Sequence, residues 1–97
     1  MDCCKGGIDM AAGLDAVRTE IVHEFGSVDI RDRYDAHTND PVLDFSVEGR
    51  YFTVRVTREF DKDYTSGQVR VNLAQLGPRL RASRDGKATV TRNGILN

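Results

Sequence analysis

One stretch, Val42–Val56, constrains the fold of this 97-residue chain more than any other feature. Its apolar side chains occupy odd positions before Glu48-Gly49 and even positions after it, which is typical of two β-strands folded on each other. A two-residue turn at Glu48-Gly49 places Phe45 opposite Phe52 on one apolar face. The other face is polar, with Asp44, Ser46, Thr53, Arg55 and Thr57. The rest of the chain must therefore cover one side of this hairpin.

Residues 11–25 predict the helix that provides this cover. Apolar side chains recur there at three- and four-residue intervals, with polar side chains between them. Asp9 is the expected N-cap and Gly26 the expected stop. The apolar stripe consists of Leu14, Val17, Ile21 and Phe25.

The segments on either side of the hairpin are less regular. Residues 27–34 alternate as a half-buried strand does, but Asp32 interrupts the apolar side, so we expect a short strand or an edge strand. The turn-forming residues of 35–41 predict a loop. We expect the second hairpin strand to extend toward Phe60, and residues 61–68 to form an exposed loop.

The last third predicts a helix followed by a strand. Residues 69–71 can extend briefly before Asn72, which is a suitable helix cap. Pro78 breaks a regular helix, so we expect either a short turn at 72–76 and a helix starting at Pro78, or one kinked helix. Asp85-Gly86 predicts a turn, 88–92 a strand, and Asn93-Gly94 a type I′ turn that the three residues after it can barely exploit. The helix presents Leu73, Leu76 and Leu80 on one side.

These elements predict a single α+β domain at 10–97, preceded by a flexible tail at 1–9. The expected order is α-β-β-β-α-β, with a mainly antiparallel sheet that helices cover on one face. The last strand can pair beside the first or at the opposite edge, and periodicity does not decide between these positions.

Composition excludes several classes of protein. No apolar run approaches the roughly 20 residues that cross a bilayer, and no signal-like region opens the chain, so we expect a cytoplasmic protein without a membrane partner. Cys3 and Cys4 are the only cysteines, and adjacent cysteines cannot cross-link the fold without strain. We expect them to be reduced, without a structural or redox role.

The titratable residues do not form a recognisable catalytic or metal-binding pattern. His23 and His37 are the only histidines, and neither has an obvious orienting partner. Asp35, His37 and Asp40 lie in a polar loop of ordinary turn composition. Asp61-Lys62-Asp63 opens like a calcium loop but lacks the glycine and distal glutamate that such a loop needs. We therefore predict no enzyme activity, no metal and no cofactor.

Charge is unevenly distributed along the chain. Residues 1–63 carry 14 acidic and 8 basic side chains, whereas residues 64–97 carry six basic side chains and one acidic one. Arg81 and Arg84, three apart, would share one side of a helix. Six cations are thus candidate contacts for an anion or a partner, and nucleic acid is a possible ligand: Arg70, Arg79, Arg81, Arg84, Lys87 and Arg92.

The segment 72–94 carries one resemblance. Its sequence NLAQLGPRLRASRDGKATVTRNG resembles the helix, turn and Thr-Arg-x-Gly strand ending of prevent-host-death antitoxins. That resemblance, over about a quarter of the chain, implies an antitoxin-like regulator. In the family this unit opens the chain and a toxin-binding tail follows, whereas here it lies near the end, and we do not assign the chain to the family.

The sequence therefore favours binding over catalysis. We expect a non-enzymatic module that binds a protein partner, with a homodimer as the simplest assembly. Exposed Tyr51 and Tyr64, an unpaired sheet edge and segregated charge all favour association. Binding of nucleic acid through the basic last third is the alternative.

Overall fold

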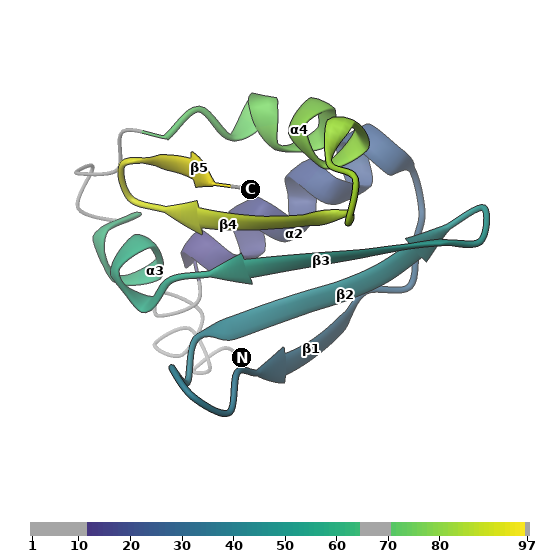
Figure 1. The fold of residues 1–97 in the computed structure, drawn as a ribbon. Helices are drawn as coiled ribbons and strands as arrows, with labels where there is room; N and C mark the ends of the chain where they lie inside the picture. The colour runs from purple at the N-terminus through teal and green to yellow at the C-terminus, as the bar shows by residue number, and fades with distance from the viewer. Residues whose placement is uncertain (1–11, 65–70, 97) are drawn as a thin grey trace, which may run out of the picture.

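The central hairpin lies within a five-stranded sheet in a computed structural model that describes residues 12–64 and 71–96. Strands follow one another in space in the order β1-β2-β3-β4-β5 (Figure 1). In chain order the elements are α2 (Ala12–Phe25), β1 (Arg31–Tyr34), β2 (Pro41–Val47), β3 (Arg50–Val56), α3 (Arg58–Tyr64), a 3-10 helix η1 (Leu73–Gln75), α4 (Leu76–Ala82), β4 (Lys87–Thr91) and β5 (Gly94–Leu96).

The predicted register of the hairpin is confirmed. Phe45 pairs with Phe52 across β2 and β3, and both are buried. Glu48 and Gly49 have φ angles of 52° and 83°, as a type I′ turn requires. Because side chains alternate across a strand, this register gives the sheet one apolar and one polar face.

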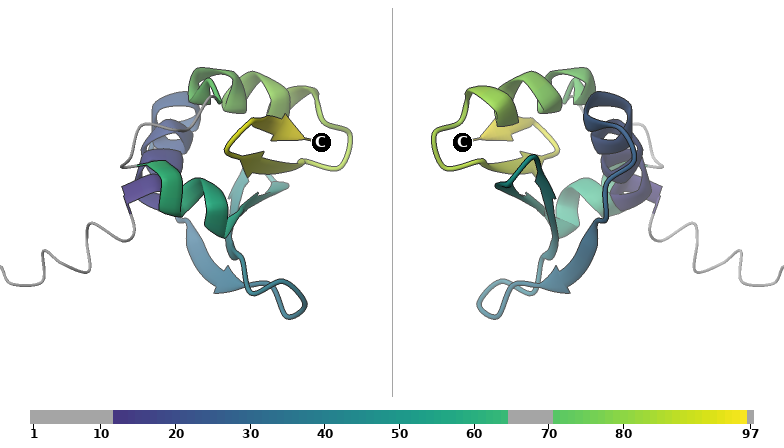
Figure 2. Two further views of the ribbon diagram at one scale, coloured as in Figure 1. Left: turned by 90° about the vertical axis from the view of Figure 1, so that its left-hand side faces the viewer. Right: turned by 90° about the vertical axis from the view of Figure 1, so that its right-hand side faces the viewer.

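The helices cover the apolar face, which confirms an α+β domain (Figure 2). In α2, Val17 and Ile21 are fully buried and Phe25 partly so. Gly26 ends this helix with a φ of 87° and donates its N–H to Val22 O over 2.8 Å. The expected N-cap, Asp9, lies outside the described residues, as does the tail at 1–9. The core comprises Val17, Ile21, Leu43, Phe45, Phe52, Val54, Val56, Phe60, Leu76, Leu80, Ala88, Val90 and Ile95.

The expected continuation of the second hairpin strand is wrong, because the strand ends at Val56 and α3 follows. Thr57 Oγ1 accepts the N–H of Phe60, and Asp40 Oδ1 accepts the N–H of Arg58, so two free donors of the first turn are satisfied. Phe60 is then fully buried. Asp61 Oδ1 accepts the N–H of Leu14 over 3.0 Å and ties α3 to α2. The predicted loop at 61–68 is therefore helical as far as Tyr64, and the rest of it lies outside the described residues.

Pro78 is accommodated in the first turn of α4. Asn72 caps η1 as expected, with its side chain accepting the N–H of Ala74 over 3.1 Å. The α-helix then begins at Leu76, two residues earlier than the predicted start. The N–H that Pro78 lacks is one of the first-turn donors that have no partner within a helix, so the ring does not break this one.

The strand predicted at 88–92 is β4, and it lies on the far side of the hairpin from β1. One further strand, β5, follows it at the edge of the sheet. β4 runs parallel to β3, with Val54 paired to Ala88, and β5 pairs antiparallel to β4. The turn before β5 lies at Arg92 and Asn93, so the predicted Asn93-Gly94 turn is wrong. Thr91 Oγ1 accepts the N–H groups of Asn93 and Gly94, which stabilises this turn without positive φ angles.

The order of elements is thus α-β-β-β-α-α-β-β, and the sheet is mixed but mostly antiparallel. The first strand is short and lies at an edge, as expected from Asp32. Within residues 12–64 and 71–96, no helix combines the length and apolar character needed to cross a bilayer.

Candidate interaction surface

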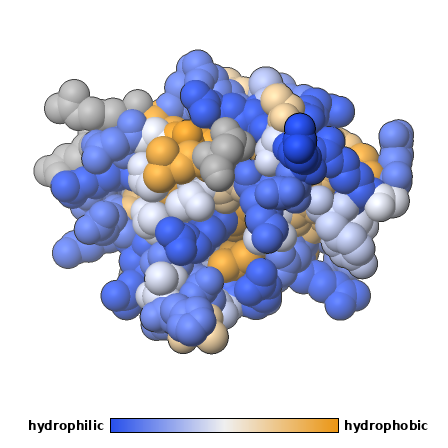
Figure 3. All heavy atoms as spheres, viewed as in Figure 1, coloured by the Kyte–Doolittle hydropathy of each residue, from blue (hydrophilic) through white to orange (hydrophobic). Residues whose placement is uncertain are grey.

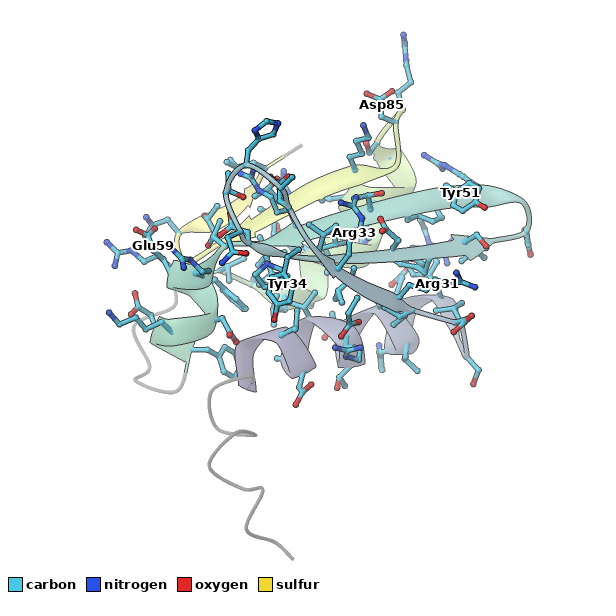
Figure 4. All side chains as sticks on the ribbon, turned by 90° about the horizontal axis from the view of Figure 1, so that it is seen from below. Arg31, Arg33, Tyr34, Tyr51, Glu59 and Asp85 are labelled. Atoms are coloured by element: carbon cyan, nitrogen blue, oxygen red, sulfur yellow. The ribbon has the colours of Figure 1, made fainter. Side chains whose placement is uncertain are left out.

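The free edge of the sheet is β1, and all four of its residues are exposed. Figure 4 shows this strand at the front of the molecule, with Arg33 and Tyr34 pointing to opposite sides of the sheet. The side chain of Tyr34 lies on the helix side and is 66% exposed. An edge strand of this kind presents unpaired N–H and C=O groups to other chains.

The outward main-chain groups of β1 belong to Asp32 and Tyr34. Asp35 donates its N–H to Asp40 O over 2.9 Å, so Asp35 and Asp40 form a hydrogen-bonded pair of the ladder between β1 and β2. Antiparallel ladders alternate hydrogen-bonded with non-hydrogen-bonded pairs, so Arg33 and Arg31 bond to β2. Asp32 and Tyr34, which alternate with these bonded residues, direct both main-chain groups away from β2.

Two ion pairs hold β1 in place. Arg33 Nε donates to Asp44 Oδ2 over 2.5 Å, and Arg18 donates from α2 to both oxygens of Asp32 over 2.8 and 2.6 Å. In each case the hydrogen bond to the carboxylate raises the pKa of the arginine above its ordinary value. Ion pairs therefore join the strand to its neighbours on both faces, while its outer main-chain groups face no other strand of the described residues.

The loop after β1 is built on Asp35. Its Oδ1 accepts the N–H groups of Thr38 and His37 over 3.0 and 2.8 Å, and these hydrogen bonds lower the pKa of Asp35. Asp40 turns instead toward α3 and Arg55, with Oδ2 3.7 Å from Arg55 Nε. In the described part of the chain, no three His, Cys, Asp or Glu side chains gather as metal ligands.

At the other edge of the sheet, a carbonyl of β5 already has a partner. Arg79 Nη1, from α4, donates to the carbonyl oxygen of Ile95 at the centre of β5 over 3.3 Å. α4 lies along the β5 side of the molecule, opposite β1 (Figures 1 and 2). β1 is therefore the edge better suited to receive another strand.

The sheet face away from the helices is mostly hydrophilic. In the view of Figures 1 and 3 the sheet lies in front of α2, and blue surface surrounds a few apolar spots. Tyr51 and Leu96 are 78% and 60% exposed. Tyr64, the other tyrosine expected on the surface, is exposed to 37% and packs on Phe60.

Three of the predicted contact cations bind oxygens of the protein itself. Arg81 Nε donates to Glu24 Oε2 over 2.7 Å and its guanidinium lies over the Phe25 ring at 4.6 Å, which joins α4 to α2. Arg92 Nη1 donates to Asp63 Oδ2 over 2.9 Å, a hydrogen bond that raises the pKa of Arg92. Arg79 is the third, through the β5 carbonyl.

The predicted cations come from several elements. Arg84 lies beyond the last residue of α4, so it does not share a helix face with Arg81 as expected. Lys87 opens β4, whereas Arg92 follows the opposite end of that strand. Arg70 lies outside the described residues.

Both histidines lie on the surface. His23 is exposed in the last turn of α2, and His37 is exposed in the loop after β1. A general base needs a partner that orients the imidazole, and the hydrogen bond of His37 to Asp35 Oδ1 is made by its main-chain N–H and not by its ring.

Comparison with known proteins finds no match to this chain among protein-family models, curated proteins or solved structures.

Sequence reasoning anticipated an open edge but not which main-chain groups it presents. The outward direction of Asp32 and Tyr34 follows from the ladder with β2, which only the paired structure defines. The contact of Arg79 with β5 was also missed, because the two segments are 16 residues apart and meet only in the fold.

Proposed function

We propose that this protein is a non-enzymatic interaction module that binds an extended segment of a protein partner along β1. The observation that supports the proposal most directly is the pair of outward main-chain positions at Asp32 and Tyr34 on an exposed strand that ion pairs join to its neighbours on both faces. In β-strand addition, main-chain hydrogen bonds supply affinity and side chains on alternate faces supply selectivity.

The chemistry of the two faces defines the partner. On the helix side, Tyr34 offers an exposed ring for an aromatic or aliphatic side chain. On the open face, Arg31 is exposed and its Nε lies 4.0 Å from Asp29, so an acidic side chain of the partner can pair with it. The preferred segment is therefore extended, with an acidic side chain opposite Arg31 on the open face.

A phage-displayed library of random peptides tests this proposal. Peptides selected on the wild-type protein should lose binding to Tyr34→Pro, because proline removes the outward N–H while the hydrogen bonds to β2 remain. Leu96→Asn, at the β5 edge, is the control and should retain them. Selected peptides that bind Tyr34→Pro as tightly as the wild type would contradict the proposal.

Nucleic-acid or antitoxin-like DNA binding is the competing proposal, and salt dependence separates the two. Phosphate binding weakens steeply as salt rises, whereas strand addition depends mainly on main-chain hydrogen bonds. Of the six candidate cations, Arg84 has no carboxylate or carbonyl partner among the described residues. Retention on heparin that falls with salt and with Arg81→Ala plus Arg84→Ala would support this alternative.

A further inference from the structure

We propose that the segment received by β1 is β1 of a second copy, in an antiparallel register centred on Arg33. This inference rests on the proposed function, since it names the occupant of the same edge. Two copies related by a twofold axis must pair outward-facing residues with outward-facing residues. Only Asp32 and Tyr34 face outward on this strand. Asp32 can therefore face Asp32, Tyr34 can face Tyr34, or Asp32 can face Tyr34, which gives three registers centred on Asp32, Tyr34 and Arg33.

The register centred on Arg33 uses the whole strand. Asp32 of each copy lies opposite Tyr34 of the other, and each of these two pairs exchanges two main-chain hydrogen bonds. A register centred on Tyr34 would place Asp32 opposite Ala36 of the second copy. Ala36 lies in the turn after β1, outside the strand, so that register keeps only the central pair.

Charge separates the remaining two registers. Centring on Asp32 places Asp32 opposite Asp32 and Arg31 opposite Arg33, so the three charged pairs within β1 are all of like sign, and Tyr34 faces Ile30. Centring on Arg33 places Arg31 of each copy opposite Asp35 of the other, which gives two attractive pairs. The one like-charge contact is between the two copies of Arg33, whose guanidinium binds Asp44 just as Asp32 binds Arg18. The two attractive pairs therefore separate the registers.

The two partners of the attractive pair are available for it. Asp35 uses Oδ1 for the N–H groups of its own loop, which leaves Oδ2 for the second copy. The Arg31 side chain is 83% exposed, and its ion pair with the equally exposed Asp29 is long, at 4.0 Å. Both residues occupy odd positions and therefore lie on the open face of the sheet.

Cysteine cross-linking at the twofold axis tests the register. In a chain carrying Cys3→Ser and Cys4→Ser, Arg33→Cys places two thiols at a non-hydrogen-bonded pair with Cα atoms about 4.5 Å apart, within the range of a disulfide. Tyr34→Cys is the matched control, because in this register its two copies are two residues out of step. Under mild oxidation, Arg33→Cys should form covalent dimer at least about tenfold faster.

Sedimentation equilibrium supplies a second readout without cysteine. Arg31→Glu turns both attractive pairs into repulsive ones and should weaken self-association about tenfold or more. Arg84→Glu makes the same charge change away from β1 and should leave self-association unchanged. Amide NMR spectra of both variants establish that the fold is intact.

The possible outcomes separate the second-copy inference from the proposed function of β1. Equal cross-linking of Arg33→Cys and Tyr34→Cys, or self-association indifferent to Arg31→Glu, overturns the second-copy inference. If library peptides still bind in a Tyr34→Pro-sensitive way, the proposed function stands and β1 receives a different protein. If Tyr34→Pro affects neither peptides nor self-association, both proposals fail.

Discussion

Phe45 and Phe52 stack across the central hairpin with ring centroids 5.2 Å apart and ring planes inclined by 20°. Phe25, the last residue of α2, lies 5.3 and 5.1 Å from the same two rings. The three rings join the first helix to both hairpin strands. These rings form part of the contact between α2 and the apolar face of the hairpin, which the alternating pattern of 42–56 predicts.

Replacing Phe45 by alanine should destabilise the protein strongly. The side chain is 3% exposed, and loss of a buried phenylalanine typically costs about 3–5 kcal/mol through lost transfer energy and the cavity left behind. Urea unfolding measures the change. Tyr51→Ala, close by on the polar face and 78% exposed, should change stability by less than about 0.5 kcal/mol. Equal effects of the two substitutions would contradict the packing described.

Gly13 should not tolerate a side chain, although it lies within α2. A Cβ there would lie 2.8 Å from Asp61 Cα and 3.1 Å from Phe60 Cε2, so α3 would have to move. We expect Gly13→Ala to destabilise by about 1–3 kcal/mol, despite the gain of about 1 kcal/mol in helix propensity. Gly94→Ala is the control, since a Cβ there meets nothing within 4 Å. A Gly13→Ala variant more stable than wild type in thermal unfolding would be inconsistent with the close approach.

Arg50 should stabilise the fold, whereas Arg84 should not. The guanidinium of Arg50 donates to the carbonyls of Arg81 and Ser83 at the end of α4 and lies 4.8 Å from the centroid of the Phe52 ring. Arg50→Ala removes these hydrogen bonds to the helix end, so we expect a loss of about 1–2 kcal/mol. Arg84→Ala should fall within about 0.5 kcal/mol of wild type. Denaturant midpoints of the two variants provide the comparison, and equal midpoints would show that Arg50 does not cap α4.

Asp35 should contribute stability that disappears in acid. Hydrogen bonds from Thr38 and His37 lower the pKa of this carboxylate in the folded state below its ordinary value of about 3.9. Its contribution is therefore present above pH 4 and is lost as the pH falls through the folded-state pKa. Asp35→Asn keeps the acceptor oxygen without titrating, so the wild type should lose more stability than this variant between pH 5 and pH 2. Carboxyl NMR titration measures the pKa directly, and a value at or above 3.9 would refute the explanation.

The bidentate pair between Arg18 and Asp32 should couple α2 to β1 measurably. Both side chains are partly exposed, at 32% and 48%, so screening by solvent limits the effect to about 0.5–1 kcal/mol. A double-mutant cycle of Arg18→Ala and Asp32→Ala in urea isolates this coupling from the effects of each substitution. The coupling should shrink in 1 M salt. Coupling near zero at low salt would mean that the pair does not hold the strand.

The local periodicity of the sequence determined the core of this fold. Alternation on both sides of Glu48-Gly49 allowed one register that gathers the apolar residues, because a shift of one residue would turn every side chain to the other face. The stripe from Val17 to Ile21 likewise determined which side of α2 is buried, since a helix of 3.6 residues per turn brings these positions together.

The tertiary structure alone decided the rest. α3 forms because Thr57 and Asp40 satisfy its first-turn donors while Phe60 enters the core, and Asp40 is far away in sequence. The position of the basic last third was likewise decided by pairing between distant segments, because β4 lies parallel beside β3 and not beside β1. Periodicity reports which side of an element is buried, but the pairing of distant elements depends on contacts that no single segment contains.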